Sequence, residues 1–103
     1  MGDRAHIKVQ QGYGDVYLYT HWGGYKIKED IATGLRRGRD RWNDPEYLAR
    51  ILFDAMKGDD VTGDTGFGIS AAEPDGSPWA VNVPDMTVMS PEGRVTSFED
   101  FCK

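Results

Sequence analysis

Cysteine, histidine and long apolar runs are scarce in this chain of 103 residues. The single cysteine, Cys102, cannot close a disulfide within the chain, and it suits a reducing compartment. With only two histidines, His6 and His21, a metal site that needs two or three imidazoles is hard to build. Charged residues follow Met1 in place of an apolar segment, so we expect neither secretion nor membrane insertion. We expect one compact cytoplasmic domain, residues 1–103.

Negative charge is concentrated in the second half of the sequence. Residues 1–57 hold ten Lys or Arg against eight Asp or Glu, whereas residues 58–103 hold two against nine. The formal net charge of the whole chain is −5. A basic first half joined to an acidic second half argues against broad binding to nucleic acid, while it allows one local anion site.

Hydrophobic periodicity predicts strands at both ends of the chain and helices in the middle. Residues 6–10 and 16–22 alternate and are joined by a glycine-containing turn, which predicts a hairpin. Apolar residues at helical spacing predict helices over 25–37 and 45–57, with Asp44 as the candidate N-cap of the second. Gly34 weakens the first helix, because glycine costs about 1 kcal/mol relative to alanine there.

From residue 67 onward, apolar residues again occupy every second position, and turns containing proline and glycine separate these short alternating segments. Ser97 then opens a short terminal helical turn in the manner of a capping box. Segregated strands and helices predict the α+β class. We expect an antiparallel sheet of five or six strands, formed by the N-terminal hairpin and a C-terminal meander, with two helices on one face.

The junction between the second strand and the first helix carries unusual side chains. Alternation places Tyr19 and His21 on the sheet face opposite Leu18, and Trp22 ends the strand directly before two glycines. Aromatic faces, an imidazole and free helix N–H groups would converge there, which favours binding of a flat or anionic group. The alternative is that the aromatic rings simply fill the core where strand meets helix.

A cluster of arginines surrounds the predicted break between the two helices at Gly38. At least two of these side chains should project from the loop, where guanidinium groups beside an indole suit phosphate or carboxylate. The alternative is a solvated helix end that favours cations. The candidate binding residues here are Arg39, Arg41, Trp42, Tyr47 and Arg50, with Arg36 and Arg37 preceding them. Because Trp42 lies off the predicted apolar stripes, we expect its replacement to leave the fold intact.

An acidic, glycine-rich loop spans residues 58–66 and adds the candidate binding residues Asp59, Asp60, Asp64 and Thr65. Backbone N–H groups of such a loop can hold an anion, and its carboxylates can imitate phosphate toward a basic partner. A flexible turn is the alternative. The loop lacks the ending of a phosphate-binding P-loop and the spacing of an EF-hand, so we expect no metal there.

Catalysis is not expected from this sequence. His21 would need Asp54 or Asp64 to orient it as a general base, and no pattern places those groups together. Cys102 has no evident activating group at the end of the chain. We expect a protein that is not an enzyme and needs no cofactor.

Three segments, 19–24 (YTHWGG), 39–50 (RDRWNDPEYLAR) and 65–70 (TGFGIS), resemble a small family of phage, prophage and microbial proteins. That family includes a type II-A anti-CRISPR protein, and the resemblance spans nearly the whole chain. It implies a protein that inhibits the RNA-guided DNA nuclease of type II CRISPR systems by direct binding, in the cytoplasm of a host bacterial cell. It assigns no functional residues.

The residues themselves leave two other functions open. One is an anti-defence protein that binds or sequesters a small nucleotide signal through an aromatic and arginine pocket, and another is a plain interaction module. The nucleotide hypothesis predicts a common concave surface. Its expected lining is Trp22, Trp42, Tyr47 and His21, with at least one of Arg39, Arg41 or Arg50.

Overall fold

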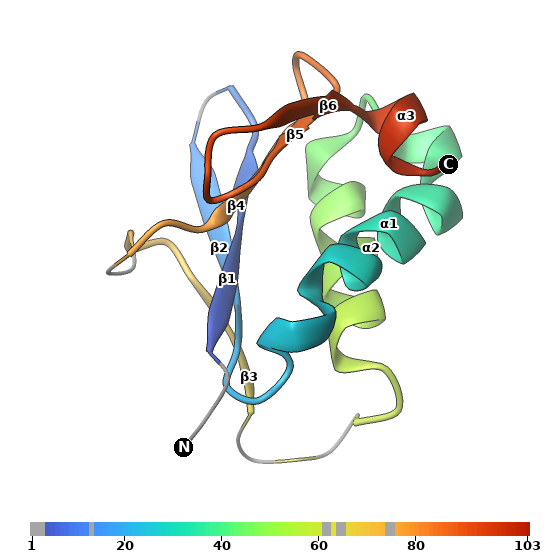
Figure 1. Ribbon diagram of the computed structural model, residues 1–103. Coiled ribbons are helices and arrows are strands. Elements are labelled where there is room, and N and C mark those ends of the chain that lie inside the picture. Colours follow the sequence, from blue (N-terminus) through green and yellow to red (C-terminus); the bar gives the residue numbers. More distant parts are fainter. Residues whose placement is uncertain (1–3, 13, 61–62, 64–65, 74–75) are drawn as a thin grey trace.

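The computed structural model describes residues 4–12, 14–60, 63, 66–73 and 76–103. Strands and helices occur in the predicted order (Figure 1). The elements are β1 (Ala5–Gln10), β2 (Asp15–Thr20), the 3-10 turn η1 (Gly24–Lys26), α1 (Ile27–Arg37), the 3-10 turn η2 (Arg39–Arg41), α2 (Pro45–Lys57), β3 (Phe67–Ser70), β4 (Trp79–Asn82), β5 (Thr87–Met89), β6 (Val95–Ser97) and α3 (Phe98–Phe101).

The six strands form one mixed, mostly antiparallel sheet in the order β3-β2-β1-β4-β5-β6. The predicted α+β fold and hairpin are confirmed, with β1 and β2 paired from Ala5↔Thr20 to Gln10↔Asp15. Two details differ from the prediction. β1 and β4 run parallel, and β3 pairs with β2 at the far edge, so the C-terminal meander contains only β4, β5 and β6.

The link between β3 and β4 causes both differences. It passes over the sheet face opposite the helices (Figure 1), where Glu73 and Ser77 share a cavity wall with Lys8 of β1. By crossing β2 and β1, it returns the chain in the direction in which β1 runs. The same face holds Tyr17, which is only 5% exposed although it points away from the helices.

α1 and α2 pack side by side on the other face of the sheet, and the core lies between the two layers (Figure 1). The predicted stripe of α1, Ile27, Ile31 and Leu35, is buried against α2 and the sheet. Gly34 lies on the helix-helix contact, where an added Cβ would be 2.6 Å from Cδ2 of Leu52. The missing side chain of Gly34 therefore allows α1 and α2 to approach closely. α1 continues past Gly34 to Arg37.

The ends of the helices follow their local sequences. Pro45 occupies the start of α2, and Gly58 follows its end with a φ of 57°. Asp44 is the N-cap residue by its backbone, but its side chain makes no capping hydrogen bond and lies 3.8 Å from Arg41. Ser97 caps α3 as predicted, since its Oγ accepts a hydrogen bond of 3.1 Å from the backbone N–H of Asp100.

Candidate functional site at the end of strand β2

Four aromatic rings follow one another at the end of β2. The rings of His6 and Tyr19 lie 4.9 Å apart, and Tyr19 Oη is hydrogen-bonded to His21 Nδ1 at 2.8 Å. His21 in turn meets Trp22 edge to face, with ring centroids 4.5 Å apart. The hairpin register brings in His6, which the sequence prediction missed, because His6 pairs with Tyr19 on the same sheet face.

The backbone around this junction fixes the exposed indole of Trp22. The N–H of His21 donates to the carbonyl of Gly66 at 2.8 Å, and the N–H of Gly23 donates to Thr20 Oγ1 at 3.0 Å. Gly66 has a φ of +103°, and a Cβ there would lie 3.1 Å from the indole. Trp22 therefore lies against bare backbone and leaves 56% of its surface exposed.

A cavity of about 590 Å³ adjoins the aromatic rings. Its lining includes Arg4, His6, Tyr19, Gly24 and Trp79. Burial lowers the pKa of His6 below its ordinary value of 6.5, which favours the neutral imidazole. This strand-end cavity thus offers one cation and aromatic faces, which suits a flat anionic molecule.

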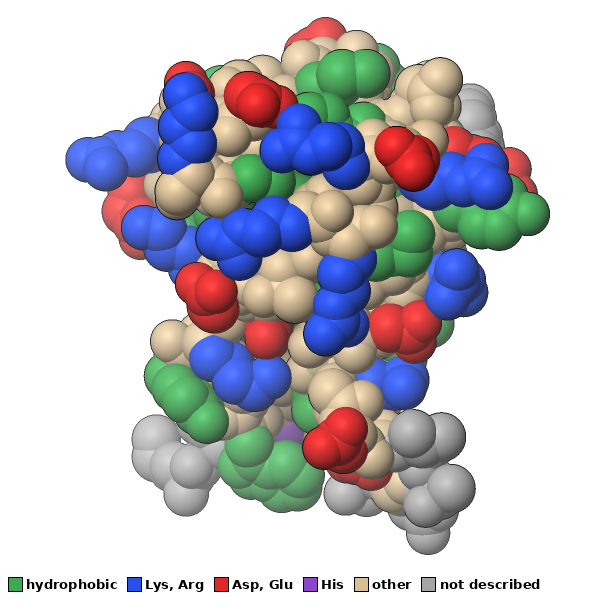
Figure 2. All heavy atoms as spheres, turned by 90° about the vertical axis from the view of Figure 1, so that its right-hand side faces the viewer, with side chains coloured by type: hydrophobic (Ala, Val, Ile, Leu, Met, Phe, Trp, Pro, Cys, Tyr) green, Lys and Arg blue, Asp and Glu red, His purple; other side chains and the backbone are tan. Residues whose placement is uncertain are grey.

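The acidic loop begins at the same end of the domain. Lys26 Nζ reaches the carbonyl of Met56 at 3.1 Å, which ties the start of α1 to the last turn of α2. Tyr25, directly before Lys26, is 80% exposed, and the exposed residues Asp59 and Asp60 follow α2. We call Trp22, Tyr25, Asp59 and Asp60 the aromatic–acidic end. Figure 2 shows hydrophobic side chains and a histidine gathered at the lower end of the molecule. The candidates Asp64 and Thr65 lie outside the described residues.

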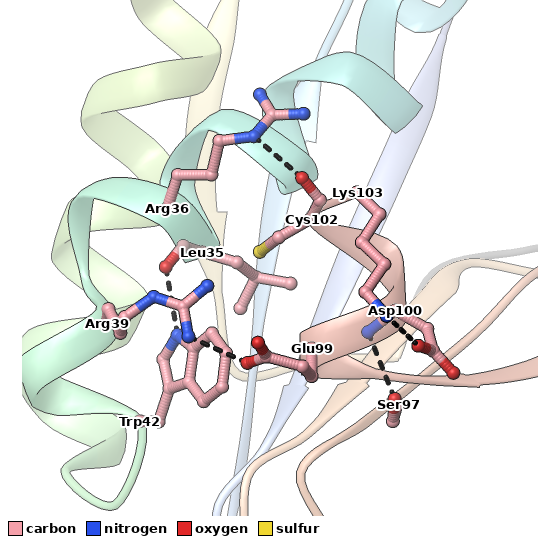
Figure 3. A network of polar contacts seen from close by, with 9 residues as sticks. All are labelled: Leu35, Arg36, Arg39, Trp42, Ser97, Glu99, Asp100, Cys102 and Lys103. Carbon is pink, nitrogen blue, oxygen red and sulfur yellow. Dashed lines mark hydrogen bonds and ion pairs between the residues drawn. The ribbon is translucent and has the colours of Figure 1, made fainter.

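The arginine cluster lies at the opposite end of α1 and makes contacts within the protein (Figure 3). Arg39 lies over the Trp42 ring, 4.6 Å from its centroid, and pairs with Glu99 at 2.7 Å. Arg36 Nε donates to the backbone carbonyl of Cys102 at 3.1 Å. These two arginines therefore hold the C-terminal helix α3 against the end of α1.

Trp42 itself is part of the packing of the domain. Its Nε1 donates to the carbonyl of Leu35 at 2.9 Å, and its ring meets Phe98 edge to face at 5.3 Å. The side chain is half-buried against the core, which opposes the expectation that replacing Trp42 leaves the fold intact. The apolar stripes missed this contact, since Trp42 lies in a loop between helices.

The other arginine candidates also have partners on their own segment. Arg41 lies 4.6 Å from the centroid of the exposed Tyr47 ring, and Arg50 pairs with Asp54 at 2.9 Å. The guanidinium of Arg41 also lies 3.8 Å from Asp44. Figure 2 shows many basic side chains on the helical face, with acidic side chains between them.

The predicted common concave surface is wrong. Trp22 precedes α1 and Trp42 follows it, so the two indoles are separated by a helix of 11 residues, which is about 16 Å long. His21 stays with Trp22, whereas Arg39, Arg41 and Tyr47 stay with Trp42. The structure therefore divides the predicted site into two parts. One is the exposed aromatic–acidic end, and the other is an arginine cluster whose side chains contact other residues of the protein.

Comparisons with known proteins do not identify the chain: no family model, curated protein or solved structure matches it. Within the described ranges, every helix is too short or too polar to cross a lipid bilayer. Among the same residues, no three His, Cys, Asp or Glu side chains are grouped so that they hold a metal ion.

Proposed function

We propose that this chain acts by binding a macromolecule through its aromatic–acidic end. The observation that carries the proposal is the exposure of two large aromatic side chains at one end, 56% for Trp22 and 80% for Tyr25. Tryptophan and tyrosine dominate the binding energy of many protein interfaces, because they desolvate large areas at low entropic cost. The exposed carboxylates of Asp59 and Asp60 lie at the same end and favour a basic partner.

The partner that we propose is the RNA-guided nuclease of a type II CRISPR system, as the sequence resemblance implies. Such a nuclease must present basic surface to its nucleic acids, and carboxylates can occupy that surface in place of phosphates. The aromatic side chains would then supply contacts that do not depend on charge. The result is inhibition by direct binding, without catalysis by this chain.

The contacts that the arginine cluster already makes within the protein favour a macromolecular partner over a nucleotide held by arginine and tryptophan. The indole N–H of Trp42 donates a hydrogen bond to the backbone carbonyl of Leu35, and the guanidinium of Arg39 donates one to the carboxylate of Glu99. A nucleotide at this cluster would have to replace these contacts. The described contacts thus oppose a ligand at Trp42.

A cleavage assay with a purified type II nuclease, its guide and a target duplex tests the proposal. We expect Trp22→Ala to raise the inhibitor concentration for half inhibition at least about tenfold, as for a side chain at the centre of an interface. The double reversal Asp59→Lys with Asp60→Lys should weaken inhibition by a similar factor and slow association. The matched control reverses two exposed carboxylates elsewhere, Glu73→Lys with Glu92→Lys, and should inhibit as the wild type does.

Two results would contradict the proposal. One is a wild-type protein that neither inhibits nor binds the nuclease. The other is inhibition that survives both Trp22→Ala and the Asp59/Asp60 reversal, with circular dichroism showing that the variants are folded. Equal losses in the control reversal would indicate that net charge, rather than this end of the molecule, is responsible.

The second candidate function is capture of a small nucleotide, and the strand-end cavity favours it. Arg4 supplies a cation for phosphate, and the Tyr19 ring supplies an aromatic face near it. Calorimetry with linear, cyclic and ribosylated nucleotides tests this function. We expect Arg4→Gln to weaken binding about tenfold and Trp22→Ala to leave it unchanged. No heat of binding and no melting shift with any of these nucleotides would eliminate the candidate.

A further inference from the structure

A second cleft lies on the helix side of the sheet, between α1 and α3. Its volume is about 390 Å³, within the usual range for small-molecule sites. Lys28 of α1, Trp79 of β4, Arg94 before β6 and Phe101 of α3 line it. It shares no residue with the aromatic–acidic end. We refer to it as the α1–α3 cleft.

The apolar part of this cleft is a pair of aromatic rings. Trp79 and Phe101 meet edge to face, with centroids 6.1 Å apart and ring planes at 75°. Both rings are half-buried, and the buried Val88 of β5 adds to the same wall. Packing against each other fixes the two rings, so a flat apolar molecule would meet a formed surface rather than mobile side chains.

The charged part consists of Lys28 and Arg94, which come from different elements. Among the described residues, neither the Lys28 ammonium nor the Arg94 guanidinium has an ion pair or a hydrogen bond. The third cation of the cleft, Lys103, pairs with Asp100 at 3.3 Å. Glu92 is the other carboxylate of the lining, so its side chains include three cations and two carboxylates in a protein of net charge −5.

Four of the other arginines differ from Lys28 and Arg94 in this respect. Arg36, Arg39, Arg41 and Arg50 all contact a carboxylate of the protein. Lys28 and Arg94 instead leave their donors available beside aromatic rings. Both residues are exposed, so an anion can reach both cations from solvent while its apolar part contacts the rings.

We propose that the α1–α3 cleft binds a small organic anion, a phosphate or carboxylate on a flat apolar body of about mononucleotide size. The flat body lies against Trp79 and Phe101, and the anionic group lies between Lys28 and Arg94. Guanidinium and ammonium groups suit phosphate and carboxylate alike, so the geometry defines the charge and shape of the ligand.

Calorimetry with four probes tests the proposal: adenosine monophosphate, indole-3-acetate, adenosine and inorganic phosphate. We expect the monophosphate or the indole carboxylate to bind at least about tenfold more tightly than adenosine, which lacks the anion, and than phosphate, which lacks the ring. Absence of binding by both aromatic anions at millimolar concentration would overturn the proposal. Adenosine that binds as well as its monophosphate would also overturn it.

Substitutions locate the bound probe. Lys28→Gln and Arg94→Gln should each weaken binding about tenfold. The matched control is Arg37→Gln, because Arg37 is an exposed cation of the same helix and lies outside the cleft lining. A control that loses as much affinity as Lys28→Gln would indicate a general charge effect and would overturn the proposed site.

Trp79 also borders the strand-end cavity, so the two cavities must be distinguished. We expect backbone amide resonances of residues 92–96 and 100–103 to shift on binding, while those of residues 4–6 remain in place. Binding that Arg4→Gln removes and Lys28→Gln leaves intact would assign the probe to the strand-end cavity and overturn the present proposal. These outcomes do not depend on nuclease inhibition, which the aromatic–acidic end tests separately.

Discussion

The guanidinium of Arg39 lies over the ring of Trp42, 4.6 Å from the ring centroid, and the indole beneath it contacts Phe98 of α3. Arg39 also reaches Glu99 of the same short helix. The stack thus connects the loop after α1 to the C-terminal segment, 60 positions further along the chain. A cation over an indole would be typical of a ligand site, but here Arg39 also contacts Glu99 of α3 (Figure 3).

Replacing Trp42 should therefore affect stability before it affects binding. We expect Trp42→Ala to lower the free energy of unfolding by about 3 kcal/mol, because it removes the contact with Phe98 and leaves a gap at the core edge. Arg39→Ala should lower it far less, since the Arg39–Glu99 pair is exposed. Urea denaturation measures both. A Trp42→Ala variant that unfolds at the wild-type urea concentration would contradict this structural role.

The sequence predicted well those parts of the fold that depend on local patterns. Ile27, Ile31 and Leu35 lie at helical spacing and are buried as expected, and the alternation around Leu18 gives the observed faces of β2. Hydrophobic periodicity carries this information because each element must bury one side. The parallel pairing of β1 with β4 has no such local signal, since it depends on how the link from β3 crosses the sheet.

The candidate site was harder to predict for the same reason. The rings around Tyr19 were predictable in part, because they are neighbours along one strand. Arg39 has a partner far away in the sequence, and nothing near Arg39 indicates that Glu99 will reach it. Lys28 and Arg94 meet across the α1–α3 cleft only after α1 and the meander have packed. Charges that look free in a sequence are therefore sorted into paired and unpaired groups only by the fold.

Gly34 provides a test of the helix-helix contact. An added Cβ would lie 2.6 Å from Cδ2 and 3.1 Å from Cα of Leu52, which forces α1 and α2 apart. We expect Gly34→Ala to destabilise the protein by about 1–3 kcal/mol through overpacking, although alanine has the better helix propensity. The control is Arg37→Ala on the exposed side of the same helix, which should change stability little. Higher thermal stability of Gly34→Ala would show that helix propensity outweighs packing here.

Asp30 should give the stability a distinct pH dependence. Burial raises the pKa of Asp30 above its ordinary value of 3.8, and the hydrogen bond from Lys26 opposes this shift only in part. A folded pKa above the unfolded pKa means that the folded state holds the proton more tightly. The contribution of Asp30 protonation to the free energy of unfolding is complete below the pKa of Asp30 in the unfolded state. It disappears as the pH rises through the pKa of Asp30 in the folded state.

We therefore expect wild-type protein to lose stability relative to Asp30→Asn as the pH increases from 3.8 upward. Urea denaturation of both proteins over a pH series measures this difference, and the other carboxylates cancel in the comparison. Carbon NMR of the Asp30 carboxyl provides an independent check. A carboxyl that titrates below 3.8, or a difference in stability that is constant with pH, would contradict the expected effect of burial.

The hydrogen bond between Tyr19 Oη and His21 Nδ1, 2.8 Å long, predicts the tautomer of His21. A phenol donates its proton to the unprotonated nitrogen of a neutral imidazole, so the ring proton of His21 should reside on Nε2. Nitrogen chemical shifts of the imidazole, recorded above the ordinary His pKa, should show this tautomer in the wild type. Tyr19→Phe removes the donor and should shift the ring toward a mixture of tautomers, at a cost of about 0.5–1.5 kcal/mol in stability.

His6 is the internal control for this experiment, because its ring contacts Tyr19 without a hydrogen bond among the described residues. Phenylalanine preserves that ring contact, so the spectrum of His6 should change little. A wild-type His21 with its proton on Nδ1 would reverse the direction of the hydrogen bond, with the imidazole donating to Tyr19. In that case Nε2 would be the acceptor of His21, and the site would present an acceptor rather than a donor to any molecule bound beside Trp22.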